Sequence, residues 1–390
     1  MRITDFTRRD FIQTAAYATG AVVTAGGLFA PARLISAPPQ SNRKLRWGLI
    51  GIGNRCRQHI KLIQEYPQDC EIVAICDIRE EGLQRGRDLI GKPVEEYKDY
   101  REMLARADIN TVLVTTPTYL HKEMVIASLR KGCDVLCEKP LGSNTRECNE
   151  IIDVWLRTDC VLHNGLQLRY HPLYQEVHKM VKDGAIGDLK FIWAVEMRGD
   201  WGKKSENPLI NEKINYMYYK DQAGGTVNNK NCHDFDIFNW VIDSRAVRVC
   251  GFGGTTVYGN RDSMDHFTSI VEYENTVKVT MGLVLFNYGY HDTVLVGDKG
   301  KLLFQRGGMQ ITWTDRYRKE KPREIKLSDD PADIHGHRGS WGLYEEFLAA
   351  VKERRPTFTG PYAGRDTVRI ADAIQVSIAE DRIVYCNEMG

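Results

Sequence analysis

The spacing of apolar and polar positions changes near residue 165. Before that point, short continuous apolar runs alternate with segments whose apolar residues recur at helical spacing. The runs predict strands at 45–50, 71–77, 110–116, 134–137 and 161–164. Helices are predicted at 54–66, 80–90, 101–107, 122–131 and 143–157. This alternation is typical of a doubly wound α/β domain, with a parallel sheet covered by helices on both faces.

After residue 165 the strands alternate in polarity and are rich in aromatic residues. Strands are predicted at 190–198, 247–258, 268–273, 276–285, 291–297, 301–305 and 309–312. Helices are fewer and are predicted at 173–183, 234–241, 340–354 and 364–380. We therefore expect an α+β domain with a large, mostly antiparallel sheet and helices on one face. Its other face would be open to self-association, giving a homo-oligomer (dimer or tetramer), and the last helix would pack back on the first domain.

Length and composition limit the number of domains, the kinds of partner and the state of the cysteines. A chain of 390 residues suggests two domains, placed at 44–165 and 166–390. A net charge of +1 gives no support for a nucleic-acid partner or for adsorption to an anionic membrane. The ten cysteines occur singly, with no C-x-x-C pair, so we predict reduced structural thiols. We predict no metal site.

Residues 1–37 are expected to lie outside the fold. Arg8 and Arg9, followed by Phe11 and a modestly apolar run at 14–30, resemble a twin-arginine (Tat) export signal. The alternative is an amphipathic N-terminal helix. An export signal of this kind predicts a periplasmic or secreted protein with the Tat machinery as a partner. No other stretch reaches the length of a membrane span, so we expect no stable membrane anchoring.

Export bears on cofactor handling. The Tat route carries folded proteins, often with cofactor bound, and free soluble cofactors are not expected outside the cytoplasm. An enzyme that needs such a cofactor and is exported in this way would therefore hold it tightly and reset it within each catalytic cycle.

A glycine-rich turn joins the first predicted strand to the first predicted helix. It reads Gly51, Ile52, Gly53, Asn54, Arg55 and Cys56. Gly51 permits the tight turn, and Gly53 lets a pyrophosphate approach the helix N-terminus. Asp77 ends the next strand and would accept hydrogen bonds from the adenosine ribose hydroxyls. This is the fingerprint of a Rossmann dinucleotide-binding domain, and the alternative is a turn that binds no phosphate.

Asp77 also bears on which nucleotide binds. Its carboxylate would repel a 2′-phosphate, which favours NAD over NADP. Arg79, two residues later, could still accept that phosphate, so NADP stays open as the less favoured cofactor.

Several further motifs stand in a fixed order along the chain. They are Thr116-Pro117 with His121, Glu138-Lys139-Pro140, Gln167-Leu168-Arg169-Tyr170 followed by Pro172, Gly224-Gly225-Thr226 and Cys232-His233-Asp234-Phe235-Asp236. With the glycine turn, they make the chain resemble the glucose–fructose oxidoreductase / inositol dehydrogenase / rhizopine-catabolism family (Gfo/Idh/MocA). The resemblance implies an NAD(P)-dependent oxidoreductase acting on CH–OH groups of a sugar, glycoside or polyol.

The same resemblance assigns roles to individual residues. Lys139 would hold the reacting hydroxyl and lower its pKa, and His233 would act as general base. Ile52, Asn54, Arg55, Thr116, Pro117, His121 and Glu138 would join Gly51, Gly53, Asp77 and Lys139 around the cofactor. Arg169 and Tyr170 would line the substrate side of the cleft. For Arg169, an ion pair with a carboxylate at the domain interface is the open alternative.

One position departs from the family pattern. Most relatives have an aspartate four residues before the histidine, where this chain has Asn229. An amide can bind a substrate hydroxyl but cannot stabilise imidazolium by charge. Either Asp234, Asp236 or Glu196 replaces the aspartate, or the proton path differs. Lys230, the next residue, would recognise an acidic sugar group or be salt-bridged.

Two rival functions stay open at this point. Some family relatives transiently oxidise a sugar, eliminate its glycosidic substituent, add water and return the hydride, so a hydrolase or lyase fits the same motifs. A non-catalytic sugar or nucleotide sensor is the second rival, motivated by Asn229.

Overall fold

The computed structural model describes residues 43–106, 108–200, 216–259, 261–287, 289–306, 308, 310–317, 319–327 and 337–390. The predicted export signal lies outside these residues. Among the helices within them, none combines the length and the apolar character that a bilayer crossing requires.

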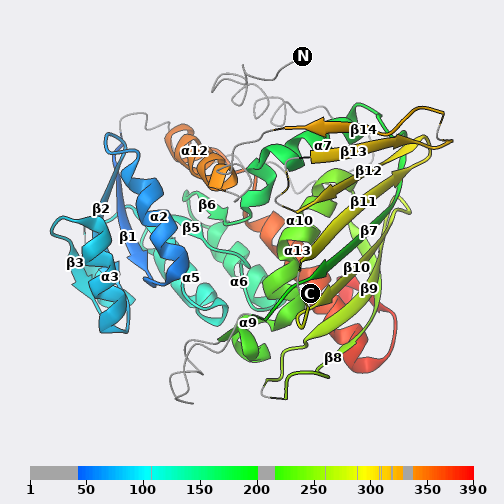
Figure 1. Cartoon of the computed structure of the whole chain (residues 1–390). Coiled ribbons are helices and arrows are strands. Elements are labelled where there is room, and N and C mark those ends of the chain that lie inside the picture. The colour runs from blue at the N-terminus through cyan, green and yellow to red at the C-terminus, as the bar shows by residue number, and fades with distance from the viewer. Residues whose placement is uncertain are drawn as a thin grey trace.

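The first sheet has six strands in the order β3-β2-β1-β4-β5-β6, and every pairing is parallel. The strands are β1 (Leu45–Ile50), β2 (Cys70–Cys76), β3 (Glu95–Tyr97), β4 (Thr111–Val114), β5 (Asp134–Cys137) and β6 (Leu162–Asn164). This order reverses between β1 and β4, where doubly wound sheets bind ligands at the carboxyl ends of their strands. The prediction of a Rossmann domain is confirmed (Figure 1).

Helices cover both faces of this sheet. One face packs on α2 (Asn54–Gln64), α3 (Glu80–Ile90) and α12 (His337–Glu353), and the other on α4 (Tyr100–Arg106), α5 (His121–Arg130) and α6 (Thr145–Trp155). Helix α12 comes from the end of the chain, far from the strands that it covers. Its Tyr344 and Phe347 rings lie 6.0 and 5.4 Å from the ring of Trp47, which is fully buried on β1. The sequence indicated this helix but not its partner.

The second sheet has nine strands in the order β14-β13-β12-β11-β7-β10-β9-β8-β15. They are β7 (Leu189–Met197), β8 (Ala246–Gly254), β9 (His266–Tyr273), β10 (Lys278–Val284), β11 (Tyr290–Gly297), β12 (Gly300–Gln305), β13 (Gln310–Asp315), β14 (Arg323–Lys326) and β15 (Val384–Tyr385). Only β7 and β10 pair in parallel among these strands, so the predicted mostly antiparallel sheet is confirmed. The two edge strands β14 and β15 are short and were not predicted.

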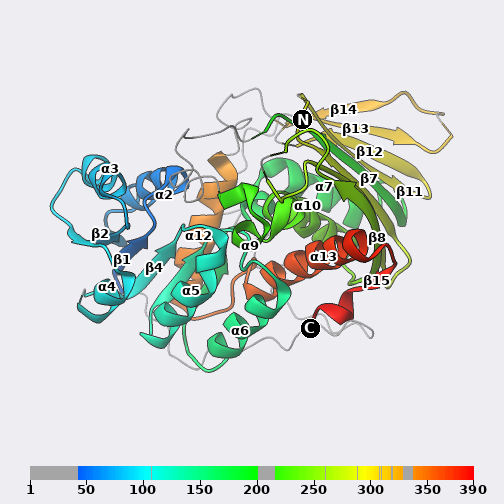
Figure 2. The same cartoon turned by 90° about the horizontal axis from the view of Figure 1, so that it is seen from below.

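The inner face of this sheet is covered by α7 (Pro172–Lys182), α10 (Gly225–Ile242) and α13 (Pro361–Glu380). Figure 2 shows α13 running along the sheet with α6 beside it. Asp372 on α13 accepts hydrogen bonds from the backbone N and Oγ1 of Thr145, the first residue of α6, at 2.5 and 2.6 Å. The last helix therefore packs back on the nucleotide-binding half, as expected from the sequence.

Helix α10 is much longer than the predicted helix at 234–241. Its first half contains glycine and three asparagines, which have low helix propensity, so the sequence pattern hid it. Almost all of its residues are buried, many of them in the core under the second sheet, and this tertiary packing overrides the local preference. The extension matters because it places Asn229, Lys230 and His233 on one rigid element.

The ten cysteines are all free, and nine of them are buried. The prediction of reduced structural thiols is confirmed.

Candidate active site

The glycine turn at the end of β1 has the shape that a dinucleotide requires. Gly51 has a φ of +86°, and a Cβ there would lie 2.8 Å from Thr116 Cγ2 and 3.0 Å from its backbone N. Gly53 precedes α2, and a Cβ on it would meet nothing within 4 Å. The first turn of α2 has no acidic residue and no side-chain cap, so its amides are free to bind an anion. Open space before free helix amides fits the pyrophosphate of NAD.

Asp77 stands directly after β2 and holds the glycine turn in place. Its Oδ2 accepts a hydrogen bond from the backbone N of Ile52 at 2.8 Å, and its Oδ1 accepts one from the backbone N of Arg79 at 2.9 Å. Arg79 Nε also approaches Oδ1 at 3.3 Å. The carboxylate lies at the edge where a ribose would arrive. Its contact with that ribose stays a prediction.

His121 connects the loops that follow β4 and β5. It is the first residue of α5 and is buried. Its Nδ1 lies 2.8 Å from the carbonyl O of Pro140, and its Nε2 lies 2.9 Å from the carbonyl O of Thr116. Burial lowers the pKa of His121, so the ring is neutral and its single N–H donates to one of these two carbonyl oxygens, which helps to hold the two loops together.

Glu138 follows β5 and is held by a relay of side chains, in which His59 and Tyr344 are buried and Arg55 is partly exposed. Arg55 Nε and His59 Nε2 donate to its Oε1 at 2.6 and 2.8 Å, and His59 Nδ1 lies 2.8 Å from the Tyr344 hydroxyl. Burial lowers the pKa of His59, so the ring is neutral, with the proton on Nε2 and Nδ1 accepting from Tyr344. The sequence analysis missed His59 and Tyr344. The one available signal was that His59 follows Arg55 by one helical turn.

The relay fixes the charge of Glu138. Burial alone would raise the pKa of its carboxyl, but the charge of Arg55 and the His59 hydrogen bond outweigh it and hold that pKa well below its usual range. The ionised Oε2 accepts the backbone N of Lys139 at 3.1 Å. Glu138 therefore sets the position of the neighbouring lysine.

Lys139 reaches from the edge of the first sheet to the start of α10. Its Nζ donates to the carbonyl O of Asn229 at 3.0 Å. Asn229 and His233 are one turn apart on this helix and share a face. The structure thus brings Lys139, Asn229 and His233 together from opposite halves of the chain, as the resemblance implied. The side chain of Tyr216 hydrogen-bonds that of Asn229 and so joins the group.

His233 is buried and lies in a positive environment. Burial lowers its pKa well below the usual range, and the charges of Lys139, Arg306 and Lys230 lower it further. Its Nδ1 is enclosed and finds no hydrogen-bond partner among the residues that the structure describes. None of the three carboxylates suggested as substitutes for the family aspartate hydrogen-bonds this ring within that part of the chain.

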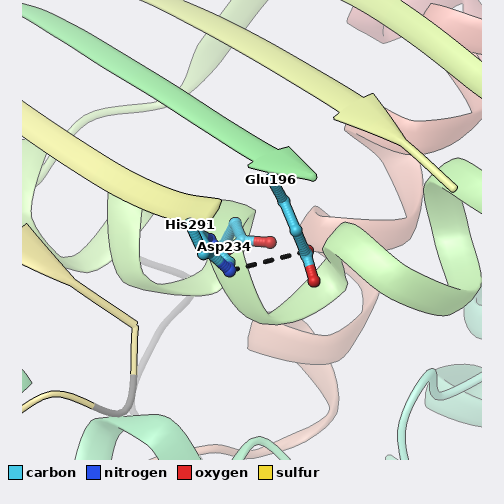
Figure 3. Close-up of side chains that lie close together, drawn as sticks. All are labelled: Glu196, Asp234 and His291. Carbon is cyan, nitrogen blue, oxygen red and sulfur yellow. Dashed lines mark ion pairs between the residues drawn. The ribbon is translucent and has the colours of Figure 1, made fainter. Parts of the chain in front are cut away.

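Two of those carboxylates belong to a set that we call the charge cluster: Glu196, Lys230, Asp234, His291 and Arg306. Figure 3 shows the side chains of Glu196 from β7, His291 from β11 and Asp234 from α10 converging between the sheet and the helix. Lys230 Nζ lies 2.7 Å from Glu196 Oε1, so the salt-bridged alternative for Lys230 is confirmed. No pattern in the sequence pointed to His291 or Arg306.

Glu196, Asp234 and His291 have the side chains and spacing of a metal site, since their ligand atoms lie within 4.8 Å of one another. Arg306 Nη1, however, lies 3.4 Å from Asp234 Oδ2 and 3.7 Å from Glu196 Oε2. With Lys230, it already balances the two carboxylates. A divalent cation would add charge to a neutral buried site, which opposes metal binding.

The side chains of Arg169 and Tyr170 bind other residues of the protein. Arg169 donates three hydrogen bonds of 2.6–3.0 Å to Asp236, and its guanidinium lies 5.0 Å over the Phe358 ring. Tyr170 is buried, with its hydroxyl 3.2 Å from Thr359 Oγ1. For Arg169 the structure supports the interface ion pair rather than substrate contact. Tyr170 likewise shows no feature that favours the predicted place in the cleft.

Residues 45–166 match the family model described as "Oxidoreductase family, NAD-binding Rossmann fold", and residues 174–303 match that of the "GFO/IDH/MocA C-terminal domain". Together the two models cover more than half of the chain. The chain belongs to the Gfo/Idh/MocA oxidoreductase family. Its first half is accordingly an NAD-binding domain.

Other Gfo/Idh/MocA-like proteins align over most of the chain. Inositol 2-dehydrogenase of Klebsiella pneumoniae (strain 342) is 26% identical over 329 residues, covering 78% of this chain and 92% of that protein. Myo-inositol 2-dehydrogenase of Thermotoga maritima is 24% identical over 368 residues, covering 88% and 99%. A solved levoglucosan dehydrogenase in complex with NADH and levoglucosan has a TM-score of 0.76 at 20% identity, covering 88% of this chain and 100% of that one. At this identity the structural likeness shows the fold.

Proposed function

We propose that this protein is an NAD-dependent dehydrogenase of a polyol, sugar or glycoside. The observation that carries the proposal is that Lys139, at the ligand-binding edge of the first sheet, donates to the first half of α10 and acts electrostatically on His233 of that helix. The inositol and levoglucosan dehydrogenases among the similar proteins support the substrate class.

The side chains divide the work of oxidising a carbinol. When bound, NAD⁺ supplies the hydride acceptor. Lys139 donates a hydrogen bond to the reacting oxygen and stabilises its developing negative charge. His233 is neutral near pH 7 because of its low pKa, so it can take the hydroxyl proton. We assign that proton to Nε2, because Nδ1 is enclosed.

Replacing the lysine tests the proposal directly. Lys139→Met should lower the rate of NADH formation from myo-inositol or levoglucosan at least about 100-fold, while NADH still binds. Lys122→Met is the matched control, because the one ion pair of Lys122 among the described residues is a surface pair with Glu150. Retained turnover in Lys139→Met would contradict the assignment. NADH binding without turnover of any sugar or polyol by the wild type would favour a sensor.

We further propose that the protein is exported through the Tat pathway and keeps its NAD bound. The paired arginines Arg8 and Arg9 support export. A retained cofactor would require ping-pong turnover, in which a second carbonyl compound re-oxidises it. Acid release of nucleotide from extensively dialysed protein, followed by mass spectrometry, checks this. An empty site would contradict retention, and release of an aglycone without net oxidation would indicate the hydrolytic rival.

Self-association through the outer face of the second sheet is part of the same proposal. Trp193, Phe252 and Ile270 stand on this face and are 38, 64 and 52% exposed. Exposed apolar side chains gathered on one sheet face are typical of an interface between copies. Trp193→Asp should shift sedimentation velocity toward the monomer. Equal sedimentation coefficients for the wild type and Trp193→Asp would contradict this interface.

A further inference from the structure

The charge cluster has more hydrogen-bonding capacity than its own members use. Its one short contact joins Lys230 Nζ to Glu196 Oε1 at 2.7 Å. The N···O distances of the remaining ion pairs are longer. They are 3.3 Å for His291–Asp234, 3.4 Å for Arg306–Asp234, 3.6 Å for His291–Glu196 and 3.7 Å for Arg306–Glu196. Good N–H···O bonds measure about 2.7–3.2 Å, so most of the cluster is in electrostatic contact without being tightly bonded.

Unused capacity of this kind is costly inside a protein. Glu196 Oε2 is enclosed and has no hydrogen-bond partner in the part of the chain that the structure describes, whereas His291 Nε2, also enclosed, approaches Asp234 Oδ1 at 3.3 Å. Asn231, beside the cluster on α10, has a further buried atom without a hydrogen-bond partner among the described residues. It is fully buried, its Nδ2 donates to Asp234 Oδ2 at 3.0 Å, and its Oδ1 finds no partner among those residues. Buried polar atoms are normally satisfied, so these atoms point to a bound group.

The cluster can be reached and stands beside the reacting groups. The side chains of Lys230, His291 and Arg306 keep 13, 13 and 16% of their surface exposed. Glu196 and His291 are paired in register on β7 and β11, and the backbone N of Arg306 donates to the carbonyl O of His291 at 3.1 Å. Lys230 lies one turn before His233 on α10. A molecule that reacts at His233 would therefore extend its other groups over the cluster.

The charges decide what kind of group fits. Two carboxylates are balanced by Lys230 and Arg306, so the cluster offers no surplus charge to an anion and resists a dication. It does offer both donors and acceptors, since ammonium and guanidinium groups carry three and five N–H bonds. Neighbouring hydroxyl groups can use both kinds of partner without adding charge.

We propose that the charge cluster is the subsite that binds hydroxyl groups of the substrate away from the reacting carbon. One hydroxyl donates to the Glu196 carboxylate, and its oxygen or that of its neighbour accepts from Arg306 or Lys230. This inference rests on the proposed function, and it makes a neutral vicinal diol the recognised feature rather than an acidic sugar group.

Calorimetric binding tests the subsite without turnover. NADH-loaded protein is titrated with myo-inositol, levoglucosan and D-glucose, for the wild type, Glu196→Gln and Arg306→Met. Loss of one charged hydrogen bond should raise the Kd of the bound polyol at least about tenfold, with the Kd of NADH unchanged. Glu150→Gln is the control, because it removes the same charge from an exposed ion pair with Lys122 and Arg146. If Arg306→Met fails to bind NADH, Arg306→Lys takes its place.

Three results would overturn the subsite: an unchanged polyol Kd in the variants, no binding of any probe by the wild type, or thermal stabilisation by Mg²⁺ or Zn²⁺ that Glu196→Gln abolishes. The proposed function fails differently. In that case the wild type binds a polyol yet forms no NADH, or Lys139→Met keeps its turnover, and the binding comparison between variants is unaffected.

Discussion

The Arg169–Asp236 pair gives the sharpest test of which residues of the second half serve folding and which serve the reaction. The side chains are 10% and 1% exposed and share hydrogen bonds of 2.6, 2.9 and 3.0 Å. Arg169→Met leaves Asp236 buried without its counter-charge. Breaking a buried pair on one side costs about 3–5 kcal/mol of unfolding free energy. The double variant Arg169→Met/Asp236→Leu removes both charges and should recover at least about 2 kcal/mol of that loss.

Urea unfolding followed by tryptophan fluorescence gives the free energies, and NADH formation gives KM and kcat. If Arg169 only supports the fold, the double variant keeps the wild-type KM within about twofold. A KM raised more than about tenfold, with the unfolding free energy unchanged in Arg169→Met, would refute the reasoning and place Arg169 against the substrate. Lys179→Met, which removes an exposed pair with Asp183, is the control for loss of charge alone.

Three further predictions follow from single groups. Burial raises the pKa of Asp372 to about 6, so ionising it costs folding free energy as pH rises from about 4 to 6. Asp372→Asn should therefore become more stable than the wild type by about 2–3 kcal/mol above pH 6 and not below pH 4, by urea unfolding. Lys230→Met removes a cation near His233 and raises its pKa, so the acid limb of kcat/KM should move up by about one pH unit. Gly53→Ala should weaken NADH binding and leave the free energy of unfolding unchanged within about 0.5 kcal/mol, because a Cβ there meets no protein atom within 4 Å. Gly51→Ala should lower both the affinity for NADH and the free energy of unfolding, because Gly51 has a positive φ and is crowded by Thr116. Titration with NADH and urea unfolding measure these two quantities.

Much of the nucleotide-binding half was predictable because its signals are local. Continuous apolar runs mark strands buried on both faces, and the glycine turn with Asp77 follows from the backbone geometry of one βαβ unit. Lys139 and His233 were placed by motif order, and the structure brings them together. Their meeting depends on α10, whose first half has low helix propensity and is held by tertiary packing.

The remaining features depend on contacts between distant segments. His59 and Tyr344 are far apart in the chain, and no periodicity links a ring on α2 to a hydroxyl on α12. His291 and Arg306 read as ordinary residues at the ends of strands until the register of β7, β11 and β12 aligns them. The sequence likewise left the partner of Arg169 undetermined, because an arginine that binds a ligand and one that pairs with Asp236 look the same in sequence.

The position of α12 has a consequence for the order in which the protein is made. Trp47 and the first strand emerge early from the ribosome, but the helix that covers them ends at Glu353. A nascent chain of residues 1–165 would cover that apolar face only in part, with α2 and α3, so the NAD-binding half should complete its core only when nearly the whole chain has been translated. NAD would then be captured late in synthesis, by a protein whose two halves already hold each other.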